Sequence, residues 1–225
     1  EVPVGEVEFG IAYNVELGID INGMENRVGG SASFEYNPIV RQTIEIDGKA
    51  DESLKNIPAI DITKGKWIGR LKDQSHKGEE DLSGEIWLTW DDDCLYLTAV
   101  VIDDIFHAAE RESGIWLNDS LQFAIGSKED SRFTGTQYYE LGAGLVNEQV
   151  DIYQWKGVMA GSSGVVKNAK GAVIRDENTK TTTYELAFPW SELYPVNPKE
   201  HNYLNFSLLV NDNDGNGRKG WLEWG

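Results

Sequence analysis

The chain has 225 residues and a formal net charge of −18, from 20 Lys and Arg against 38 Asp and Glu. Such a charge repels phosphate backbones and anionic lipid, which argues against nucleic acid and membrane surfaces as partners. No apolar run approaches the roughly 20 residues that a membrane span needs.

Residues 1–38 differ in pattern from the rest of the chain. Strands are expected around residues 4–15 and 17–21, a Gly-rich stretch follows at 28–31, and Asn37-Pro38 marks a boundary. We expect residues 1–38 to be the tail of a preceding module or extra N-terminal strands, and residues 39–225 to form one module. Because the chain begins at Glu1 rather than Met, we also expect a fragment of a longer precursor, whose export signal lies upstream.

Apolar and polar residues alternate through most of the remaining sequence, which is typical of half-buried strands. In residues 84–90, for example, Ile86 and Leu88 share one face and Trp87 lies on the other. Further strands are predicted at residues 95–101, 121–125, 138–142, 150–155, 172–175, 182–188 and 204–211, and short helical turns at 50–55 and 190–193. Many short strands with Gly, Asp and Asn turns predict an all-β, antiparallel two-sheet β-sandwich with jelly-roll or immunoglobulin-like wiring.

The chain is rich in aromatic residues, with eight Trp, nine Tyr and seven Phe. Most of them are expected to fill the core, but Trp116 lies in a polar loop, residues 113–120, with no alternation to bury it. An exposed tryptophan is costly unless it binds something. A flat indole suits the C–H face of a pyranose ring, so Trp116 is a candidate sugar contact. The alternative is an indole folded back over the core.

One hairpin carries a pattern typical of calcium loops. Residues 212–217, followed by Glu223, place oxygen ligands and a turn glycine at the spacing of a twelve-residue calcium loop. The candidate metal ligands are Asp212, Asp214, Asn216 and Glu223. Strands rather than helices flank this loop, so a solvated hairpin turn remains the alternative. The aspartates at 91–93 and 103–104 are competing sites or charged turns.

Six segments, in order along the chain, resemble carbohydrate-binding module family 9, whose modules are appended to bacterial xylanases and related enzymes. The matching segments are residues 46–52, 90–97, 101–104, 116–123, 184–190 and 206–224. Together they extend over some four-fifths of the chain.

This resemblance implies a sugar-binding site as well as a fold. Trp116 and Trp224 stand where two tryptophans of the family sandwich a terminal sugar. Gln122 stands where members often carry Glu, and Asn211 is the second polar candidate; a Gln can donate and accept hydrogen bonds but carries no charge. Tyr139 and Leu209 stand where members specific for reducing ends use arginine and amides.

The same resemblance implies a non-catalytic module that targets a plant-type polysaccharide, xylan or β-glucan. Its expected partners are an oligo- or polysaccharide and a catalytic glycoside hydrolase domain in the same parent chain. A secreted, extracellular location and structural calcium are also implied.

Two other functions are compatible with a β-sandwich. A glycosidase or lyase would need two carboxylates across a cleft, and Glu140 and Glu185 lie on predicted strands. A haem-binding, cytochrome-like sandwich would need axial ligands, for which Met24 and Met159 are the only methionines. Neither methionine lies in a motif that resembles such a ligand, and the sequence contains no nucleophile elbow.

Overall fold

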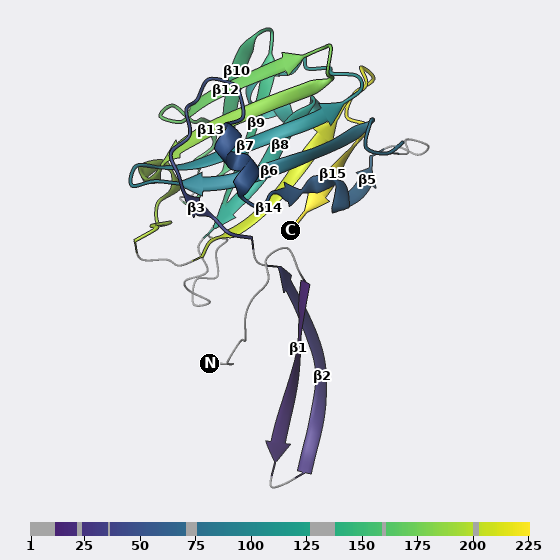
Figure 1. The fold of residues 1–225 in the computed structure, drawn as a ribbon, viewed down its shortest axis with the longest axis vertical. Helices are drawn as coiled ribbons and strands as arrows, with labels where there is room; N and C mark the ends of the chain where they lie inside the picture. The colour runs from purple at the N-terminus through teal and green to yellow at the C-terminus, as the bar shows by residue number, and fades with distance from the viewer. Residues whose placement is uncertain are drawn as a thin grey trace.

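The chain forms two β-sheets that pack face to face, with a separate hairpin beside them (Figure 1). The computed structural model describes residues 12–21, 24–35, 37–70, 76–126, 138–158, 161–199 and 203–225, with side chains from residue 37 onward. The predicted antiparallel two-sheet β-sandwich is confirmed. No helix of the described residues is long and apolar enough to cross a bilayer.

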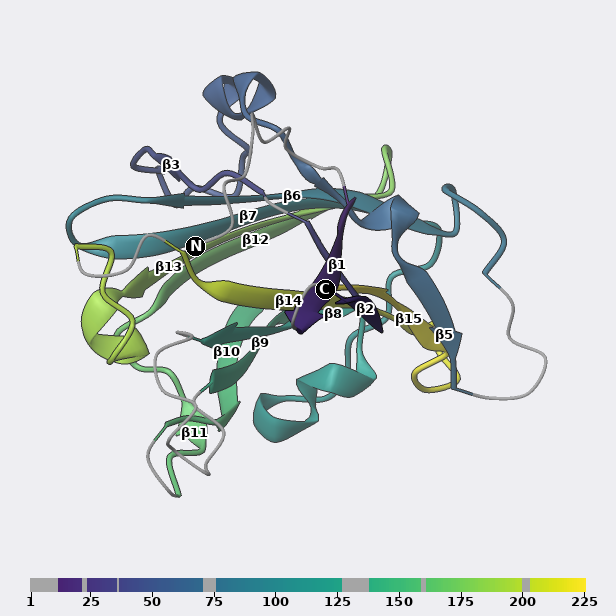
Figure 2. The ribbon, with the colours of Figure 1, turned by 90° about the horizontal axis from the view of Figure 1, so that it is seen from below.

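The larger sheet has seven strands, all antiparallel to their neighbours. Their spatial order is β11 (Gly164–Val165), β10 (Gln149–Lys156), β9 (Tyr138–Val146), β8 (Ser120–Gly126), β14 (Asn205–Asp212), β15 (Gly220–Trp224) and β5 (Lys66–Gly69). Viewed along the layers, this sheet lies below the second one, and the short helix η3 (Glu112–Leu117) lies on its far side (Figure 2).

The smaller sheet has six strands. Its order is β12 (Lys170–Asp176), β13 (Thr181–Pro189), β7 (Cys94–Asp103), β6 (Leu82–Trp90) and β3 (Val40–Arg41), and β4 (Ile60–Asp61) also pairs with β6. Only the pairing of β3 with β6 is parallel. Three further short helices are η1 (Glu52–Asn56), η2 (Ile62–Lys64) and η4 (Trp190–Leu193), and η1 and η4 fall where helical turns were predicted.

Alternate residues of the strands fill the core between the two sheets. Phe123 of the large sheet meets Phe188 of the small one edge to face, with ring centroids 5.7 Å apart. The small sheet is also covered on its other side, where Trp87 packs with Ile44 and Leu54 in a second apolar cluster. Both faces of β6 are therefore buried, as the apolar residues on both sides of its pattern require.

The N-terminal strands stay apart from both sheets. β1 (Ala12–Ile21) and β2 (Met24–Glu35) pair only with each other in the described part of the chain. Their hairpin extends away from the sandwich in Figure 1. Among the described residues these strands pair with neither sheet of the module, and both the tail of a preceding module and extra N-terminal strands remain predictions for residues 1–38.

Asp91 organises the turn between β6 and β7. Its carboxylate accepts hydrogen bonds from the amides of Asp93 and Cys94, both 2.8 Å, and from the hydroxyls of Thr43 and Tyr96, at 2.8 and 2.6 Å. The aspartates at 91–93 thus build a charged turn. Burial alone would raise the pKa of Asp91, but these bonds stabilise the charged form and lower the pKa to about 2.

We predict that Asp91→Ala lowers the free energy of unfolding by about 2 kcal/mol at neutral pH, because four donors lose a charged acceptor. The folded pKa is depressed below the ordinary 3.8, so this stabilisation is present above about pH 4 and is lost as the pH falls through about 2. Urea unfolding at several pH values measures it. The control is Asp92→Ala, which removes only an exposed ion pair with Arg41. Equal stability of the two variants at pH 7 would contradict the role given to Asp91.

Candidate functional site

The outer face of the seven-stranded sheet, the side turned away from the core, carries four of the eight site residues singled out by sequence: Trp116, Gln122, Asn211 and Glu223. Leu121, Val210 and Leu222 lie opposite one another on the core side. The alternate positions therefore point outward. Asn211 lies opposite both Ser120 and Trp221. Two residues further along β8, Gln122 lies opposite Leu209 of β14 and Gly142 of β9.

Helix η3 lies over this outer face and carries Trp116. Its Ile115 is fully buried and packs beside Gly144 of β9. Asn118 fixes the end of the loop, since its side chain accepts from the amides of Ala109 and Glu110 at 3.1 and 3.0 Å. The segment expected to be a polar loop is thus a short helix with a buried anchor, and Trp116 has a defined position beside the sheet.

An arginine lies against Trp116. The guanidinium carbon of Arg218 is 5.5 Å from the ring centroid of Trp116 and 3.9 Å from that of Trp221. Arg70 stacks on Trp116 as well, at 4.9 Å. We call these four residues the Trp116 stack. Burial, and then the charge of Arg70, lower the pKa of Arg218 to about 10, so Arg218 stays charged at neutral pH.

The structure does not bring Trp224 to this face. Trp224 packs against the core on the same side of β15 as Leu222, and its ring centroid is 6.2 Å from that of Phe206. Trp221 is instead the tryptophan of β15 that shares the guanidinium of Arg218 with Trp116. Alternation alone left open which of the two tryptophans faces outward, and the resemblance selected Trp224. The apolar Leu222, two residues before Trp224, was the available clue to the inward side.

The two predicted polar residues differ in what they offer a ligand. Gln122 is half-buried on the outer face, and its Nε2 donates to Oε1 of Glu140 at 2.8 Å. Asn211 is fully buried, with Nδ2 donating to Ser120 Oγ at 3.0 Å and Oδ1 accepting from Arg218. Asn211 therefore positions Arg218 rather than presenting a free amide.

A second aromatic pair lies on the same face, and the sequence analysis did not identify it. Tyr153 of β10 is opposite Gly142, and its ring centroid is 5.6 Å from that of Trp155. Nε1 of Trp155 donates to the carbonyl of Ser113 at 3.0 Å, which ties β10 to the helix that carries Trp116. A Cβ on Gly142 would lie 2.5 Å from the Trp155 ring, so this glycine is what lets the indole lie on the sheet.

The predicted calcium loop is only partly assembled. Nζ of Lys219 lies 3.1 Å from Asp212, 3.2 Å from Asp214 and 2.6 Å from Asp81. Asn216 is exposed in the hairpin turn. Glu223 points to the outer face, where it accepts from Nε1 of Trp221 at 3.3 Å. The structure thus joins Asp212 and Asp214 but separates them from Asn216 and Glu223.

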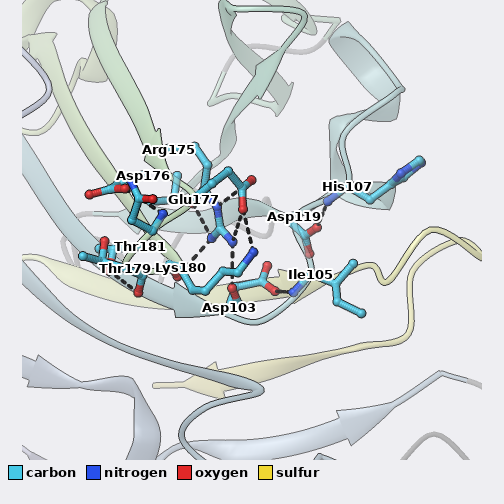
Figure 3. Close-up of polar contacts among 12 residues, drawn as sticks. Asp103, Ile105, His107, Asp119, Arg175, Asp176, Glu177, Thr179, Lys180 and Thr181 are labelled. Atoms are coloured by element: carbon cyan, nitrogen blue, oxygen red, sulfur yellow. Dashed lines mark hydrogen bonds and ion pairs between the residues drawn. The ribbon is translucent and has the colours of Figure 1, made fainter.

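Two further carboxylates lie beside Asp212. Asp103 and Asp119 are 1% and 3% exposed and lie side by side (Figure 3). Burial, and the charge of neighbouring carboxylates, raise the pKa of both groups and raise that of Asp212 to about 6. We call Asp81, Asp103, Asp119, Asp212 and Asp214 the acidic cluster. As placed, no three His, Cys, Asp or Glu side chains of the described residues converge in a geometry that could hold a metal ion.

The comparisons with known proteins agree with this architecture. Residues 46–225 match the family described as carbohydrate family 9 binding domain-like. The chain belongs to this family. Two solved structures of a carbohydrate binding module family 9 from Caldicellulosiruptor kristjanssonii are similar, one in complex with glucose and one with cellotriose.

The glucose complex is 18% identical with a TM-score of 0.56, and the match covers 82% of this chain and 83% of that chain. The cellotriose complex is 17% identical with a TM-score of 0.54, and the match covers 82% of this chain and 81% of that chain. At these identities the likeness shows the fold. None of the curated proteins matches the sequence.

The family 9 module keeps the two candidate catalytic acids apart. Glu140 lies on the outer face of the large sheet, whereas Glu185 lies on the outer side of the small sheet, where it accepts from the amides of Asp47 and Gly48. The whole sandwich therefore separates the two. Of the methionines considered for haem, Met159 lies outside the described residues, and Met24 lies on β2, whose side chains are not described.

We predict that Lys219→Met destabilises the module by about 3 kcal/mol, because the acidic cluster loses the cation that three of its carboxylates share. The control is Lys64→Met: Lys64 pairs with Asp61 at 3.1 Å but is 82% exposed, so little change is expected. Denaturant unfolding without added divalent ions compares the two. A Lys219→Met variant as stable as Lys64→Met would show that the cluster does not depend on the ammonium.

Proposed function

We propose that this module binds a plant-type polysaccharide, xylan or β-glucan, on the outer face of its seven-stranded sheet. The observation that carries the proposal is the arrangement of aromatic rings around polar groups: Trp116 on one side, Trp155 on the other, and Gln122 with Glu140 between. Family membership and the sugars held by the two similar modules support it.

Each part of this face matches a part of a pyranose. The half-buried indoles offer flat apolar surface for the C–H faces of the sugar. Glu140 can accept hydroxyl hydrogens, and Gln122 can both donate and accept. Burying hydroxyl groups is favourable only when such partners meet them. Tryptophan stacking is therefore assigned to Trp116, with Trp155 and Trp221 as the neighbouring rings in place of Trp224.

The module is proposed to act without catalysis, as the binding part of a secreted glycoside hydrolase. The separation of Glu140 from Glu185 supports this, because paired catalytic carboxylates must lie about 5 to 10 Å apart across one cleft. The catalytic domain in the parent chain and the extracellular location follow from what the family resemblance implies.

Structural calcium is proposed at the acidic cluster rather than at the predicted loop. Buried carboxylate oxygens Oδ1 of Asp212 and Oδ1 of Asp214 have no hydrogen-bond partner, and neither has Oδ1 of the neighbouring Asp104. Such atoms are costly to bury, and oxygen donors of this kind are the ligands that Ca²⁺ takes. Asp103, Asp119, Asp212 and Asp214 would hold the ion once their side chains turn toward a common point, since as placed they do not converge on one, and its charge would offset theirs.

We predict dissociation constants for neutral xylo- or cello-oligosaccharides in the micromolar to millimolar range, roughly −4 to −8 kcal/mol. Trp116→Ala should weaken binding at least tenfold, about 1.4 kcal/mol, because the proposed flat stacking contact with the sugar is lost. Isothermal titration calorimetry measures the dissociation constants of the wild type and of the variant. Trp224→Ala is the comparison: it removes an indole that packs with Phe206, so affinity should change less than in Trp116→Ala once folding is verified. A larger loss of affinity in Trp224→Ala than in Trp116→Ala would instead indicate that Trp224 contacts the sugar.

We also predict that a chelator lowers the melting temperature by several degrees, since an ion at 100 times its dissociation constant adds about 2.7 kcal/mol of stability. Asp212→Asn should remove most of this shift, whereas Glu223→Gln should keep it, because Glu223 lies on the other side of the sheet. Thermal unfolding with and without added Ca²⁺ distinguishes the variants. An unchanged melt on chelation would exclude calcium as a structural component.

A further inference from the structure

The arginines of the Trp116 stack differ from the other arginines whose side chains are described. Arg41, Arg111 and Arg175 each pair with a carboxylate. Arg70 and Arg218 pair with no carboxylate of the described residues; their partners are indole rings and the amide of Asn211. In a chain with a net charge of −18, two neighbouring arginines without an acidic partner among the described residues are a local exception.

Arg218 supplies a fixed positive charge beside Trp116 and Trp221. The residue is only 8% exposed, its guanidinium lies against two indoles, and its buried Nε has no hydrogen-bond partner. Removing a charge from water without an opposite charge nearby is unfavourable, and a second guanidinium close by adds repulsion. A bound anion would relieve both costs.

Arg70 is the arginine that a ligand can reach. It directly follows β5, it is exposed, and its guanidinium lies over the ring of Trp116. Its backbone amide donates to the carbonyl of Lys219 at 2.9 Å, which fixes the position of Arg70 beside the β14–β15 hairpin. A guanidinium stacked on Trp116 at the edge of the proposed sugar site can meet a carboxylate with two parallel hydrogen bonds.

We propose that the site prefers an acidic sugar, with the carboxylate of a uronate unit bound by Arg70 beside Trp116 and the charge of Arg218 behind it. This inference rests on the proposed function, because it assigns the ligand class of the same outer face. Arg70 directly follows β5 and lies over the ring of Trp116, so in this proposal the carboxylate of the ligand lies on the β5 side of Trp116.

The test uses ligands that differ only in charge: a xylo-oligosaccharide substituted with glucuronic acid, and the methyl ester of the same compound. Calorimetry should give the acid at least about tenfold tighter binding at low salt. The preference should shrink near 1 M salt, where the Debye length is about 3 Å. Unsubstituted xylo-oligosaccharide of the same backbone length shows whether neutral sugar binds at all.

Variants assign the preference to its residue. Arg70→Gln should bring the ratio of the two affinities close to one, and Arg70→Lys should keep part of it, because the charge remains while the planar fork is lost. Arg41→Gln is the matched control: Arg41 stacks on Trp90 at 5.7 Å, far from the outer face, so the ratio should not change.

The outcomes separate the two hypotheses. If wild type binds the acid no better than its ester, the acidic-sugar preference is overturned while sugar binding stands. A preference that survives Arg70→Gln overturns the assignment to Arg70. Absence of binding to all three sugars contradicts the proposed function, and the preference fails with it.

Discussion

The period of two along a β-strand constrains every part of this molecule. On β8, β14 and β15, each residue that fills the core is followed by one that faces outward, so the sandwich and the candidate site are built by the same strands. Leu222 buries its side chain between the sheets while Trp221 supports Arg218 on the outer side. A shift of one residue in register would turn the core residues outward and the site residues inward. The packing of the core therefore also fixes the positions of the site residues.

The β14–β15 hairpin also directs two neighbouring charged side chains to different sides of the sheet. Arg218 and Lys219 are adjacent, yet Arg218 turns to the indoles and Lys219 turns to the acidic cluster. One short segment thus supplies a cation to each side of the sheet. Because Lys219 is held by the acidic cluster, the geometry of that cluster also constrains where the adjacent Arg218 lies.

Sequence reasoning predicted the fold because alternation is local, and strands, turns and the position of Trp116 in a polar segment are visible residue by residue. The choice between Trp221 and Trp224 required knowing which side of β15 faces the core. The calcium loop failed to assemble for a similar reason: oxygen spacing matched, but strand geometry turned Glu223 to the opposite side from Asp212. Arg70 could not be found from sequence, because β5 reaches β15 across some 150 residues of chain.

The strand that carries Arg70 to the site is also an edge. β5 is four residues long, and among the described strands it pairs only with β15, so its other side has no neighbouring strand in that part of the chain. Exposed edges invite a second chain to add a strand, and natural proteins discourage this with short strands and positive charges. Lys64, Lys66 and Arg70 bracket β5 with exposed cations. The exposed cations around β5, Arg70 among them, therefore disfavour edge-to-edge pairing between copies of the module.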